Sequence, residues 1–451
     1  MQGRILIGEL ASHVGETVAI GASVEVRRDQ GKLVFFDFRD RSGVVQGVVL
    51  PGSAALEVAK EVRNEYIVRV EGIVNKRPEK NVQADKQNGD IELEVTGVEI
   101  LSRAEELPFD KDAEDLTIET RFDYRPFTLR STRDRDIFQV QSTVLAAFHD
   151  SLTTKGFTEF IAPALVGGDA EGGAAVFEIP DYYGKRAFLA TSGQLYKQIM
   201  VGPMERVMTI AKTFRAEKSA TTRHLSEITQ LEFEMGYVAG PADVMEVLEA
   251  VVRDISTTVA QKHADVFARF NVAPALLPST PFPVFTLREA QEIIEKEFGG
   301  KAVGEPDLEP EHERQICEYA KRELSSDFVF ITHFPTSKRA FYTMADPENP
   351  ELSLSFDLLF RGLEINSGAQ RIHDHDELVA KMQERGMDPS KFAFYLQAFK
   401  YGLPPHGGCS TGLERITARM LELANVKEAS SFPRDMNRID TLLSKNETDT
   451  D

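Results

Sequence analysis

Short apolar runs separated by turn residues dominate the first quarter of the chain. Pro51-Gly52-Ser53 interrupts this pattern before a helix that we expect over residues 55–63. The runs that alternate or stay apolar like strands are 18–20, 33–38, 44–50, 66–74 and 91–101. Five strands with a helix inserted after the third are typical of a small barrel of the oligonucleotide-binding (OB) type. Another small β-barrel without a nucleic-acid role is the alternative.

The pattern changes to a mixture of helices and strands in the rest of the chain. Ile137, Val140, Val144 and Phe148 recur at helical spacing and predict a long helix that ends near Lys155. Further helices are expected at 244–255, 287–298 and 378–385, and strands at 207–214, 229–237, 328–332 and 353–360. Strands broken by helices, without regular βαβ alternation, favour an α+β domain on a mixed or antiparallel sheet.

These patterns predict a division of the chain into three parts. Residues 1–103 form the barrel, and residues 134–451 form the α+β domain. The segment between them, 104–133, is charged and poorly periodic and contains Pro108 and Pro126, so we interpret it as a hinge. A length of 451 residues suits two or three domains with substantial cores.

Composition excludes several classes of protein. An apolar fraction of 42% with 27% charged residues is ordinary for a soluble globular protein. The sequence has no apolar run of membrane-spanning length, and its first residues lead directly into a strand-like segment rather than a signal peptide. Two cysteines provide neither a disulfide framework nor metal-ligand spacing. We therefore expect a cytoplasmic protein that has no membrane partner.

The net charge of −20 argues superficially against a nucleic-acid partner. Residues 1–103, however, carry 14 Lys and Arg against 16 Asp and Glu, a net charge of −2, so the remainder carries −18. Phosphate contacts need a local basic patch rather than a basic protein. Overall charge consequently leaves nucleic-acid binding open.

The densest cluster of reactive side chains lies between two strand-like runs, at Phe214-Arg215-Ala216-Glu217 and Thr222-Arg223-His224. Side chains on the same face of neighbouring antiparallel strands converge on one patch. Arginine grips phosphate in a fixed two-pronged geometry. The cluster therefore indicates a phosphate site, and the alternative is a salt-bridged hairpin at a solvated edge.

Three more segments of the second domain have unusual chemistry. Thr191 to Lys197 places a hydroxyl, an amide and an ammonium close together. Arg361 to Arg371 mixes acid, hydroxyl and arginine at alternating strand positions. Gly407 to Arg415 is a glycine-rich strand-to-helix turn with an arginine at its helix end.

Together with Gly156 to Pro163, these segments resemble motifs 1, 2 and 3 of the class II aminoacyl-tRNA synthetases, in order and with fitting separations. The sequence between them is similar to the aspartate–tRNA ligase family with a compact catalytic domain of archaeal and eukaryotic type, notably at 356–364, 399–408 and 432–435. The resemblance covers residues 15–440. It implies an N-terminal OB-fold that binds the anticodon, followed by a class II catalytic domain on an antiparallel sheet.

The resemblance implies ATP-dependent activation of L-aspartate to aspartyl-adenylate, followed by transfer to tRNA(Asp), with tRNA(Asn) left open as a second acceptor. Arg215 would neutralise the α-phosphate, and Arg415 would stack on the adenine and reach the γ-phosphate; these two are the catalytic residues. The remaining ATP-binding residues would be Glu217, Arg223, His224, Glu364 and Gly412. Mg²⁺ would be held by Glu364 and Ser367, with Asp357 as an accessory ligand.

For the amino acid, the resemblance implies that Lys197 and Arg371 hold the side-chain carboxylate through charge-assisted hydrogen bonds. Their partners around the substrate would be Glu171, Ser192, Gln194, Glu232 and Ser367. A surface salt bridge is the alternative role for Lys197.

The barrel would read the anticodon through Arg28, Phe35 and Gln46, with Phe35 stacked on a base and Gln46 reading a base edge. Phe35 could instead be a core aromatic, because Phe36 and Phe38 lie beside it. The family also implies a homodimer whose interface includes residues 135–163.

The chain departs from the family pattern at three places. Cys409-Ser410-Thr411-Gly412 replaces the usual Phe-Gly-Leu-Gly, and Gly193 replaces a common proline. Glu232 stands where aspartate enzymes usually have Asp and asparagine enzymes have Glu. An asparagine–tRNA ligase is therefore the first alternative. A catalytically idle tRNA-binding paralogue and a paralogue that makes free asparagine are further alternatives.

Overall fold

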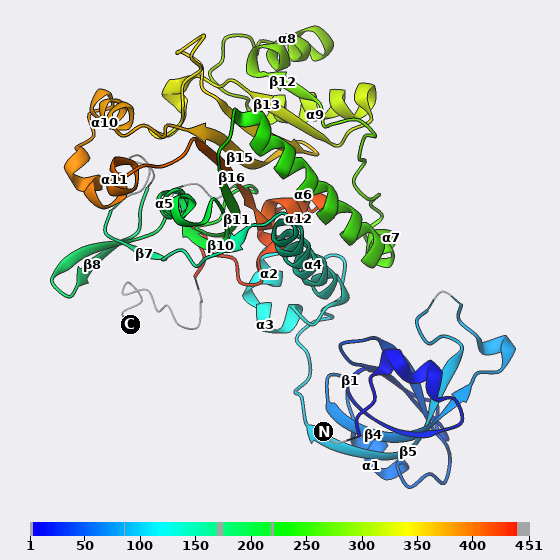
Figure 1. Cartoon of the computed structure of the whole chain (residues 1–451). Helices are drawn as coiled ribbons and strands as arrows, with labels where there is room; N and C mark the ends of the chain where they lie inside the picture. The colour runs from blue at the N-terminus through cyan, green and yellow to red at the C-terminus, as the bar shows by residue number, and fades with distance from the viewer. Residues whose placement is uncertain (1–2, 85, 169–174, 217, 219–220, 440–451) are drawn as a thin grey trace, which may run out of the picture. The chain divides into compact units, whose positions relative to one another are not determined.

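The computed structural model describes residues 3–84, 86–168, 175–216, 218 and 221–439 (Figure 1). The chain divides into two compact units, Met1–Asp110 and Lys111–Asp451. No helix in the described ranges is both long and apolar enough to cross a membrane.

The first unit is a closed five-stranded barrel with the strand order β1-β2-β3-β5-β4. The helix α1 (Leu56–Glu61) follows the third strand, as the turn pattern predicts. Alternate residues of each strand point inward, and Phe36 and Phe38 stack in the core with ring centroids 5.2 Å apart. The predicted OB-type barrel is confirmed. Its elements are η1 (Ile7–His13), β1 (Thr17–Asp29), β2 (Val34–Arg39), β3 (Val44–Val49), β4 (Ile67–Lys76), η2 (Glu79–Asn81) and β5 (Ile91–Ser102).

The second unit is built on an eight-stranded sheet with the order β12-β13-β14-β15-β16-β11-β10-β6. Its pairs are antiparallel except β12 with β13 and β10 with β6, so the predicted α+β domain on an antiparallel sheet is confirmed. The strands are β6 (Thr158–Glu159), β10 (Arg206–Phe214), β11 (Glu227–Gly236), β12 (Val284–Thr286), β13 (Phe328–Thr332), β14 (Ser355–Phe360), β15 (Leu363–Arg371) and β16 (His406–Gly412). A small separate sheet has the order β7-β9-β8, with β7 at Leu165–Val166, β8 at Glu178–Tyr182 and β9 at Lys185–Leu189.

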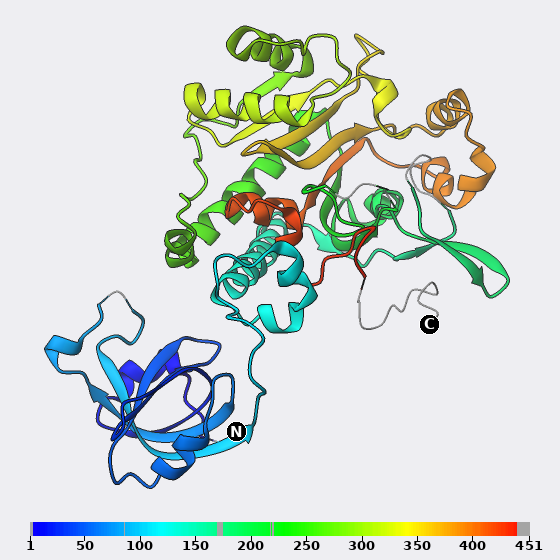
Figure 2. The ribbon, with the colours of Figure 1, turned by 180° about the vertical axis from the view of Figure 1, so that it is seen from behind.

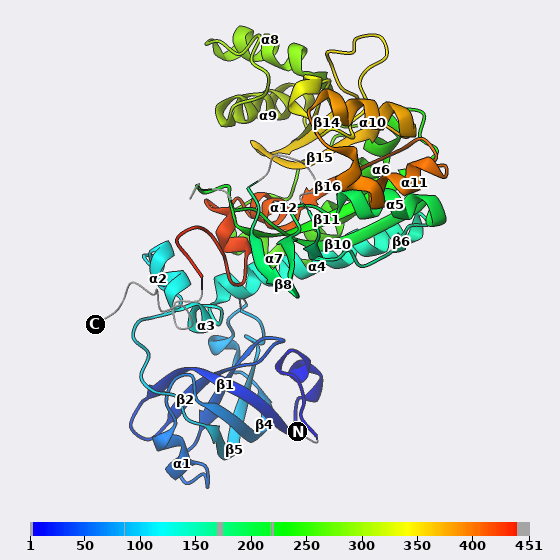
Figure 3. The ribbon, with the colours of Figure 1, turned by 90° about the vertical axis from the view of Figure 1, so that its left-hand side faces the viewer.

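Helices cover the large sheet on one face and at one end. The long helices α4 (Thr132–Thr154) and α6 (Pro241–Lys262) lie side by side on one face, with α12 (Leu413–Met420) beside them (Figures 1 and 2). The helices α8 (Leu287–Phe298) and α9 (Pro310–Leu324) pack together at the β12 end (Figure 3). Other helical elements of this unit are α5 (Gln194–Met204), α7 (Ala264–Phe270), η3 (Thr336–Lys338), α10 (His375–Glu384), η4 (Pro389–Phe392), α11 (Ala393–Lys400) and η5 (Val426–Ala429).

The central strand β11 shows how the sequence gives the sheet two different faces. Leu231, Phe233 and Met235 belong to the apolar core under α4 and α6. The residues between them, among them Glu232 and Glu234, have the opposite orientation because successive side chains of a strand alternate. The face away from the long helices is therefore lined by acids and amides, and the candidate site lies there.

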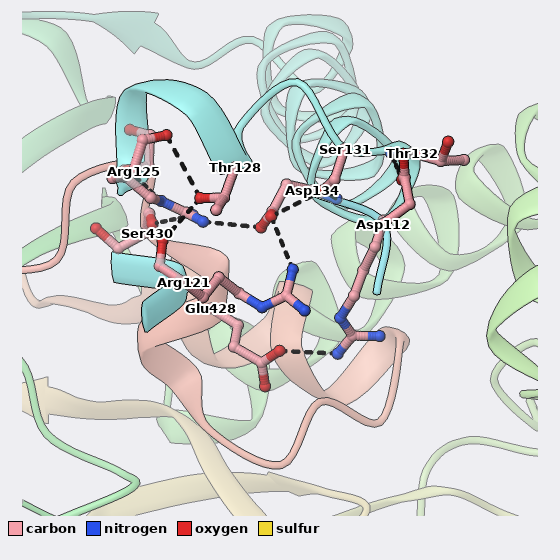
Figure 4. Close-up of polar contacts among 11 residues, drawn as sticks. Asp112, Arg121, Arg125, Thr128, Ser131, Thr132, Asp134, Glu428 and Ser430 are labelled. Atoms are coloured by element: carbon pink, nitrogen blue, oxygen red, sulfur yellow. Dashed lines mark hydrogen bonds and ion pairs between the residues drawn. The ribbon is translucent and has the colours of Figure 1, made fainter. Parts of the chain in front are cut away.

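The segment before α4 is tied to the second unit by a buried ion network (Figure 4). The helices α2 (Ile118–Asp123) and α3 (Arg125–Thr128) supply Arg121 and Arg125, whose guanidinium groups lie 3.1 and 2.8 Å from the two carboxylate oxygens of Asp134. Arg125 also donates to the carbonyl of Ser430 at 2.9 Å. Residues 111–133 of the segment interpreted as a hinge thus belong to the second unit, and the boundary between the units follows Asp110.

Candidate active site

A polar pocket with a volume of about 300 Å³ opens on the acid-lined face of the sheet. Eleven of the residues expected at the catalytic site line it: Ser192, Gln194, Arg215, Arg223, His224, Glu232, Glu364, Ser367, Arg371, Gly412 and Arg415. Two others, Lys197 and Asp357, are buried next to lining residues. Glu171 and Glu217 lie outside the residues that the structure describes. Folding thus brings together groups that are far apart in the sequence.

A buried pair of cations closes one end of the pocket. Lys197, on the first turns of α5, is 1% exposed, and its Nζ lies 3.2 Å from Glu232 and 3.4 Å from Glu234. Arg371, at the end of β15, donates from Nε to Glu234 at 2.9 Å and from Nη2 to the carbonyl of Gly408 at 2.8 Å. The same Nη2 donates to Gln194 at 3.2 Å. The surface salt bridge considered for Lys197 is excluded because its side chain is buried.

Glu234 is the anion that both cations share, and it is not among the residues that the family resemblance implies for the site. Burial alone would raise the pKa of this carboxyl, but Arg371 and Lys197 together bring it below its ordinary value. Glu234 is therefore ionised and orients both cations. The alternating pattern of β11 indicates Glu234 from the sequence, because Glu232 and Glu234 are two residues apart and therefore share a face of the strand.

Glu232 differs from Glu234 in that its carboxylate faces the pocket. It is 1% exposed, and among the described residues neither of its oxygens has a hydrogen-bond partner, although Lys197 is within ion-pair distance. A Cβ atom built on Gly193 would lie 3.2 Å from Glu232 Oε2, so the absence of a side chain at 193 leaves space for the longer acid. Glu232 is thus a buried anion with acceptor capacity directed at a ligand.

The opposite end of the pocket carries the arginines expected to bind phosphate. Arg415, at the start of α12, donates to the carbonyl of Glu364 at 2.8 Å and lies 3.4 Å from its carboxylate. Arg223 pairs with Glu313 and donates to the carbonyl of Gly362 at 3.2 Å. Together with Arg215 these side chains give this end of the pocket the positive groups that an oligophosphate requires.

The oxygen donors on the pocket wall suit Mg²⁺ in part. Glu364 and Ser367 line the pocket, whereas both oxygens of Asp357 accept from Arg339, at 3.1 and 2.7 Å. Burial raises the pKa of Asp357 to about 6 against the effect of Arg339. No group of three or more His, Cys, Asp or Glu side chains in the described part of the chain could hold a metal ion. One carboxylate with a hydroxyl nevertheless fits Mg²⁺, which typically takes its other ligands from phosphate and water.

The unusual residues of β16 each find a place in the sheet. Cys409 is buried in the core, and burial raises the pKa of its thiol to about 12. Ser410 faces the pocket and donates to Gln230 Oε1 at 2.7 Å. Thr411 accepts from the amide of Asn366 at 2.7 Å. The polar side chains of Ser410 and Thr411 thus form hydrogen bonds with the neighbouring strands β11 and β15.

The three residues expected to bind the anticodon share the outer surface of the barrel. Phe35 is half-buried and pairs across the strands with Arg28, while Gln46 pairs with Asp37. Arg28 forms a two-pronged bond to Asp37 at 2.8 and 3.0 Å. Because Phe36 and Phe38 fill the core, Phe35 points to the other face of β2.

Comparison with known proteins places the chain in a family. The family of tRNA synthetases class II (D, K and N) matches residues 117–436, and the OB-fold nucleic acid binding domain matches residues 17–101. The chain belongs to the class II tRNA synthetases, enzymes that ligate amino acids to tRNA.

Within this class, the similar proteins include aspartate ligases over nearly the whole length. The aspartate–tRNA(Asp/Asn) ligase of Thermus thermophilus is 41% identical over 97% of this chain and 99% of the relative. The aspartate–tRNA(Asp) ligase of Pyrococcus horikoshii is 35% identical over 94% of this chain and 96% of the relative. Among solved structures, a putative aspartyl-tRNA synthetase from Leishmania major has a TM-score of 0.88 at 29% identity, covering 97% of this chain and 95% of its own.

The asparaginyl-tRNA synthetase from Pyrococcus horikoshii, complexed with asparaginyl-adenylate, has a TM-score of 0.87 at 31% identity, with coverage of 97% and 100%. The backbone fold is therefore common to aspartate and asparagine enzymes, and selectivity depends on pocket side chains.

Proposed function

We propose that this chain is an aspartate–tRNA ligase that activates L-aspartate with ATP and transfers it to tRNA(Asp). The observation that carries the proposal is the buried cation pair Lys197 and Arg371 at the closed end of the pocket. Two cations facing a substrate carboxylate form charge-assisted bonds that a neutral amide cannot form with both. The names of the similar ligases support the same amino acid.

In the first step, an α-carboxylate oxygen of aspartate attacks the α-phosphorus of ATP. The bond from this phosphorus to the bridging oxygen breaks, and pyrophosphate leaves. Such displacement depends on positioning and charge neutralisation. Arg215 neutralises the α-phosphate, and Arg223, His224 and Arg415 hold the outer phosphates.

Mg²⁺ held by Glu364 and Ser367 would supply further charge neutralisation at the phosphates. Asp357 remains bound to Arg339 and keeps Ser367 in place through that arginine, which also donates to the Ser367 hydroxyl at 3.2 Å. In the second step, a hydroxyl of the terminal adenosine of tRNA attacks the activated carbonyl, and AMP leaves.

Glu232 pairs with the ammonium group of aspartate and with Lys197. Its free acceptor capacity faces the pocket, and its extra methylene relative to Asp brings it within 3.2 Å of Lys197. When aspartate is bound, Lys197 keeps its hydrogen bond to the carbonyl of Cys409 at 2.9 Å, and Arg371 keeps its ion pair with Glu234. The pocket therefore retains its preference for aspartate.

The OB barrel binds the anticodon loop through Arg28, Phe35 and Gln46. Names of relatives that include both tRNA(Asp) and tRNA(Asn) support tRNA(Asn) as a second acceptor. The enzyme acts in the cytoplasm as a homodimer through residues 135–163. This segment ends in the edge strand β6, which has only β10 beside it in the described sheet, and in Ile161, whose side chain is 81% exposed.

ATP–pyrophosphate exchange measured separately with aspartate and asparagine tests the proposal. Aspartate should support exchange much better than asparagine, and Arg215→Ala should lower the rate by several orders of magnitude in a folded protein. A preorganised partner of transition-state charge is typically worth about 3–4 kcal/mol. Comparable exchange with asparagine would exclude the aspartate preference, and survival of exchange in Arg215→Ala would remove Arg215 from the α-phosphate.

An asparagine–tRNA ligase is the second candidate, because Gly193 lacks the Cβ atom that would crowd Glu232 and so leaves space for the longer acid. Charging of purified tRNA(Asp) and tRNA(Asn) with each labelled amino acid distinguishes the two enzymes. Aspartate on tRNA(Asp) alone would exclude tRNA(Asn) as a second acceptor.

A further inference from the structure

Glu313 is a buried acid at the phosphate end of the pocket that comes from outside the synthetase motifs. It lies on α9, a helix whose apolar side packs with α8 in a core cluster separate from that of the central strands. Its side chain is 11% exposed. A carboxylate is rarely buried to this extent unless it is paired.

The contacts of Glu313 join two groups that have separate roles in the proposed reaction. Its Oε1 accepts from Arg223 Nη1 at 3.3 Å, and its Oε2 pairs with Nη2 of the same guanidinium. Oε2 also accepts from the backbone N–H of Glu364 at 2.9 Å. The carboxylate of Glu313 thus fixes both the phosphate-binding Arg223 and the start of β15 at Glu364, the expected Mg²⁺ ligand.

The pairing leaves part of Arg223 available to a ligand. A guanidinium has five N–H donors, and the contacts to Glu313 and Gly362 use three of them. The Nε–H and one Nη1–H remain for the pocket that Arg223 lines. Burial raises the pKa of Glu313, but Arg223 and the Glu364 N–H oppose this by stabilising the carboxylate. Glu313 and the carbonyl of Gly362 therefore hold the positively charged guanidinium of Arg223 in one orientation before a ligand binds.

We propose that Glu313 is a positioning residue for the triphosphate of ATP, acting through Arg223 and Glu364, and that α9 is thereby coupled to nucleotide binding. The inference rests on the proposed function of the pocket. A bidentate carboxylate removes the rotamer freedom of the long arginine side chain, so less entropy is lost when phosphate binds. The same carboxylate holds the start of β15 against α9.

Calorimetric titration of the full chain with ATP, in the absence of amino acid, tests this role without catalysis. Glu313→Gln keeps the size of the side chain but removes its charge, and it should raise the Kd for ATP about tenfold, both with and without Mg²⁺. Glu318→Gln is the matched control, since Glu318 is an exposed residue of the same helix. Its Kd should stay within twofold of the wild type. Glu313→Asp, which keeps the charge, should recover part of the affinity.

A double-mutant cycle separates positioning from general stabilisation. In an Arg223→Lys background, Glu313→Gln should have less than a threefold effect on the Kd for ATP, because the two-pronged pair is already lost. An undiminished effect would exclude action through Arg223. In pyrophosphate exchange, Glu313→Gln should raise the KM for ATP and leave the KM for aspartate within twofold.

An unchanged or lower Kd for ATP in folded Glu313→Gln would overturn the inference, and a lower value would show that Glu313 competes with phosphate. If Glu313→Gln does not fold, Glu313→Asp replaces it in the double-mutant cycle with Arg223→Lys, and the Kd for ATP is compared in the same way. Wild-type protein that binds ATP but shows no exchange with aspartate would exclude the proposed function and leave the binding test of Glu313 intact. Wild-type protein that does not bind ATP would exclude both.

Discussion

At the scale of single residues, the amino-acid end of the pocket balances two cations against two buried carboxylates. Glu234 is committed to orienting Lys197 and Arg371, so Glu232 is the anion that remains for a substrate ammonium. Sequence motifs identify the cations and Glu232. They do not identify Glu234 or Glu313, because the importance of these acids depends on contacts with partners 137 and 90 residues away.

Glu232→Asp should increase selectivity for aspartate over asparagine about tenfold in kcat/KM of pyrophosphate exchange. The carboxylate of the shorter acid lies farther from Lys197, so this cation interacts more strongly with the substrate carboxylate while it keeps its contacts with Glu234 and Cys409. A tenfold change corresponds to about 1.4 kcal/mol. Glu227→Asp at the half-buried start of β11 is the control and should leave selectivity unchanged. Lower selectivity in Glu232→Asp would show that Glu232 itself supports the aspartate preference.

His406 predicts a pH dependence of stability. It is fully buried, its Nδ1 lies 2.9 Å from the carbonyl of Pro404, and its Nε2 lies 2.9 Å from the amide nitrogen of Gln198. A neutral ring donating from Nδ1 and accepting at Nε2 satisfies both contacts. Burial lowers its pKa to about 4. The unfolded chain, with a histidine pKa of about 6.5, therefore binds a proton between pH 6.5 and 4 that the native state does not.

Stability should consequently fall as pH decreases from 6.5 towards 4, and His406 should account for about 2 kcal/mol between pH 7 and 5. His406→Gln should reduce the pH dependence of the free energy of unfolding by that amount, measured by urea denaturation at the two pH values. His149→Gln, at a half-exposed histidine, is the control. An unchanged pH dependence in His406→Gln would show that the imidazole is protonated in the native state.

At the scale of elements, periodic patterns predict the two longest helices, α4 and α6, and the strands β10, β11, β13 and β14, but not the 15-residue helix α9. The helix expected over 287–298 is α8, and its Thr286–Glu289 capping box is present. The long helix that starts the second domain is α4, which ends at Thr154. The short helices α2 and α3 escape prediction because they are held by ion pairs rather than by an apolar stripe.

Asp134→Ala should therefore destabilise the second unit by about 3–5 kcal/mol, because it leaves two guanidinium groups buried without their shared anion. The midpoint of urea unfolding, followed by circular dichroism, measures this loss. Asp150→Ala on the exposed face of the same helix is the control and should change stability by less than about 0.5 kcal/mol. Equal stability of the two variants would mean that α2 and α3 are held by packing alone.

At the scale of the whole molecule, the two compact units carry separable tasks under the proposed function. The order of a five-stranded barrel followed by an α+β domain follows from the sequence pattern. The boundary after Asp110 does not, since residues 111–133 lack periodicity and join the second unit through side-chain contacts such as those of Arg121 and Arg125.

Phe35→Ala should weaken charging of tRNA and leave tRNA-free pyrophosphate exchange unchanged. Stacking of one base on an aromatic ring is worth about 1–3 kcal/mol, so kcat/KM for tRNA should fall about tenfold or more. Phe36→Ala is the contrasting variant, because this buried neighbour should lower the melting temperature of the barrel. Equal loss in both assays for Phe35→Ala would contradict a role confined to tRNA.

The space that Gly193 leaves beside Glu232 links positions 193 and 232 in the evolution of this pocket. A side chain at 193 would place its Cβ 3.2 Å from one oxygen of Glu232 and 3.6 Å from the Cδ atom. A side chain at 193 would therefore crowd the longer acid and require its carboxylate to shift by a few tenths of an ångström, whereas glycine at 193 accommodates either acid at 232 without a shift. The effect of glutamate at 232 thus depends on the residue at 193, and the favoured order of mutation is glycine at 193 before glutamate at 232. A library that varies position 232 alone in a relative with proline at 193 should yield glutamate less often than a library that varies both positions.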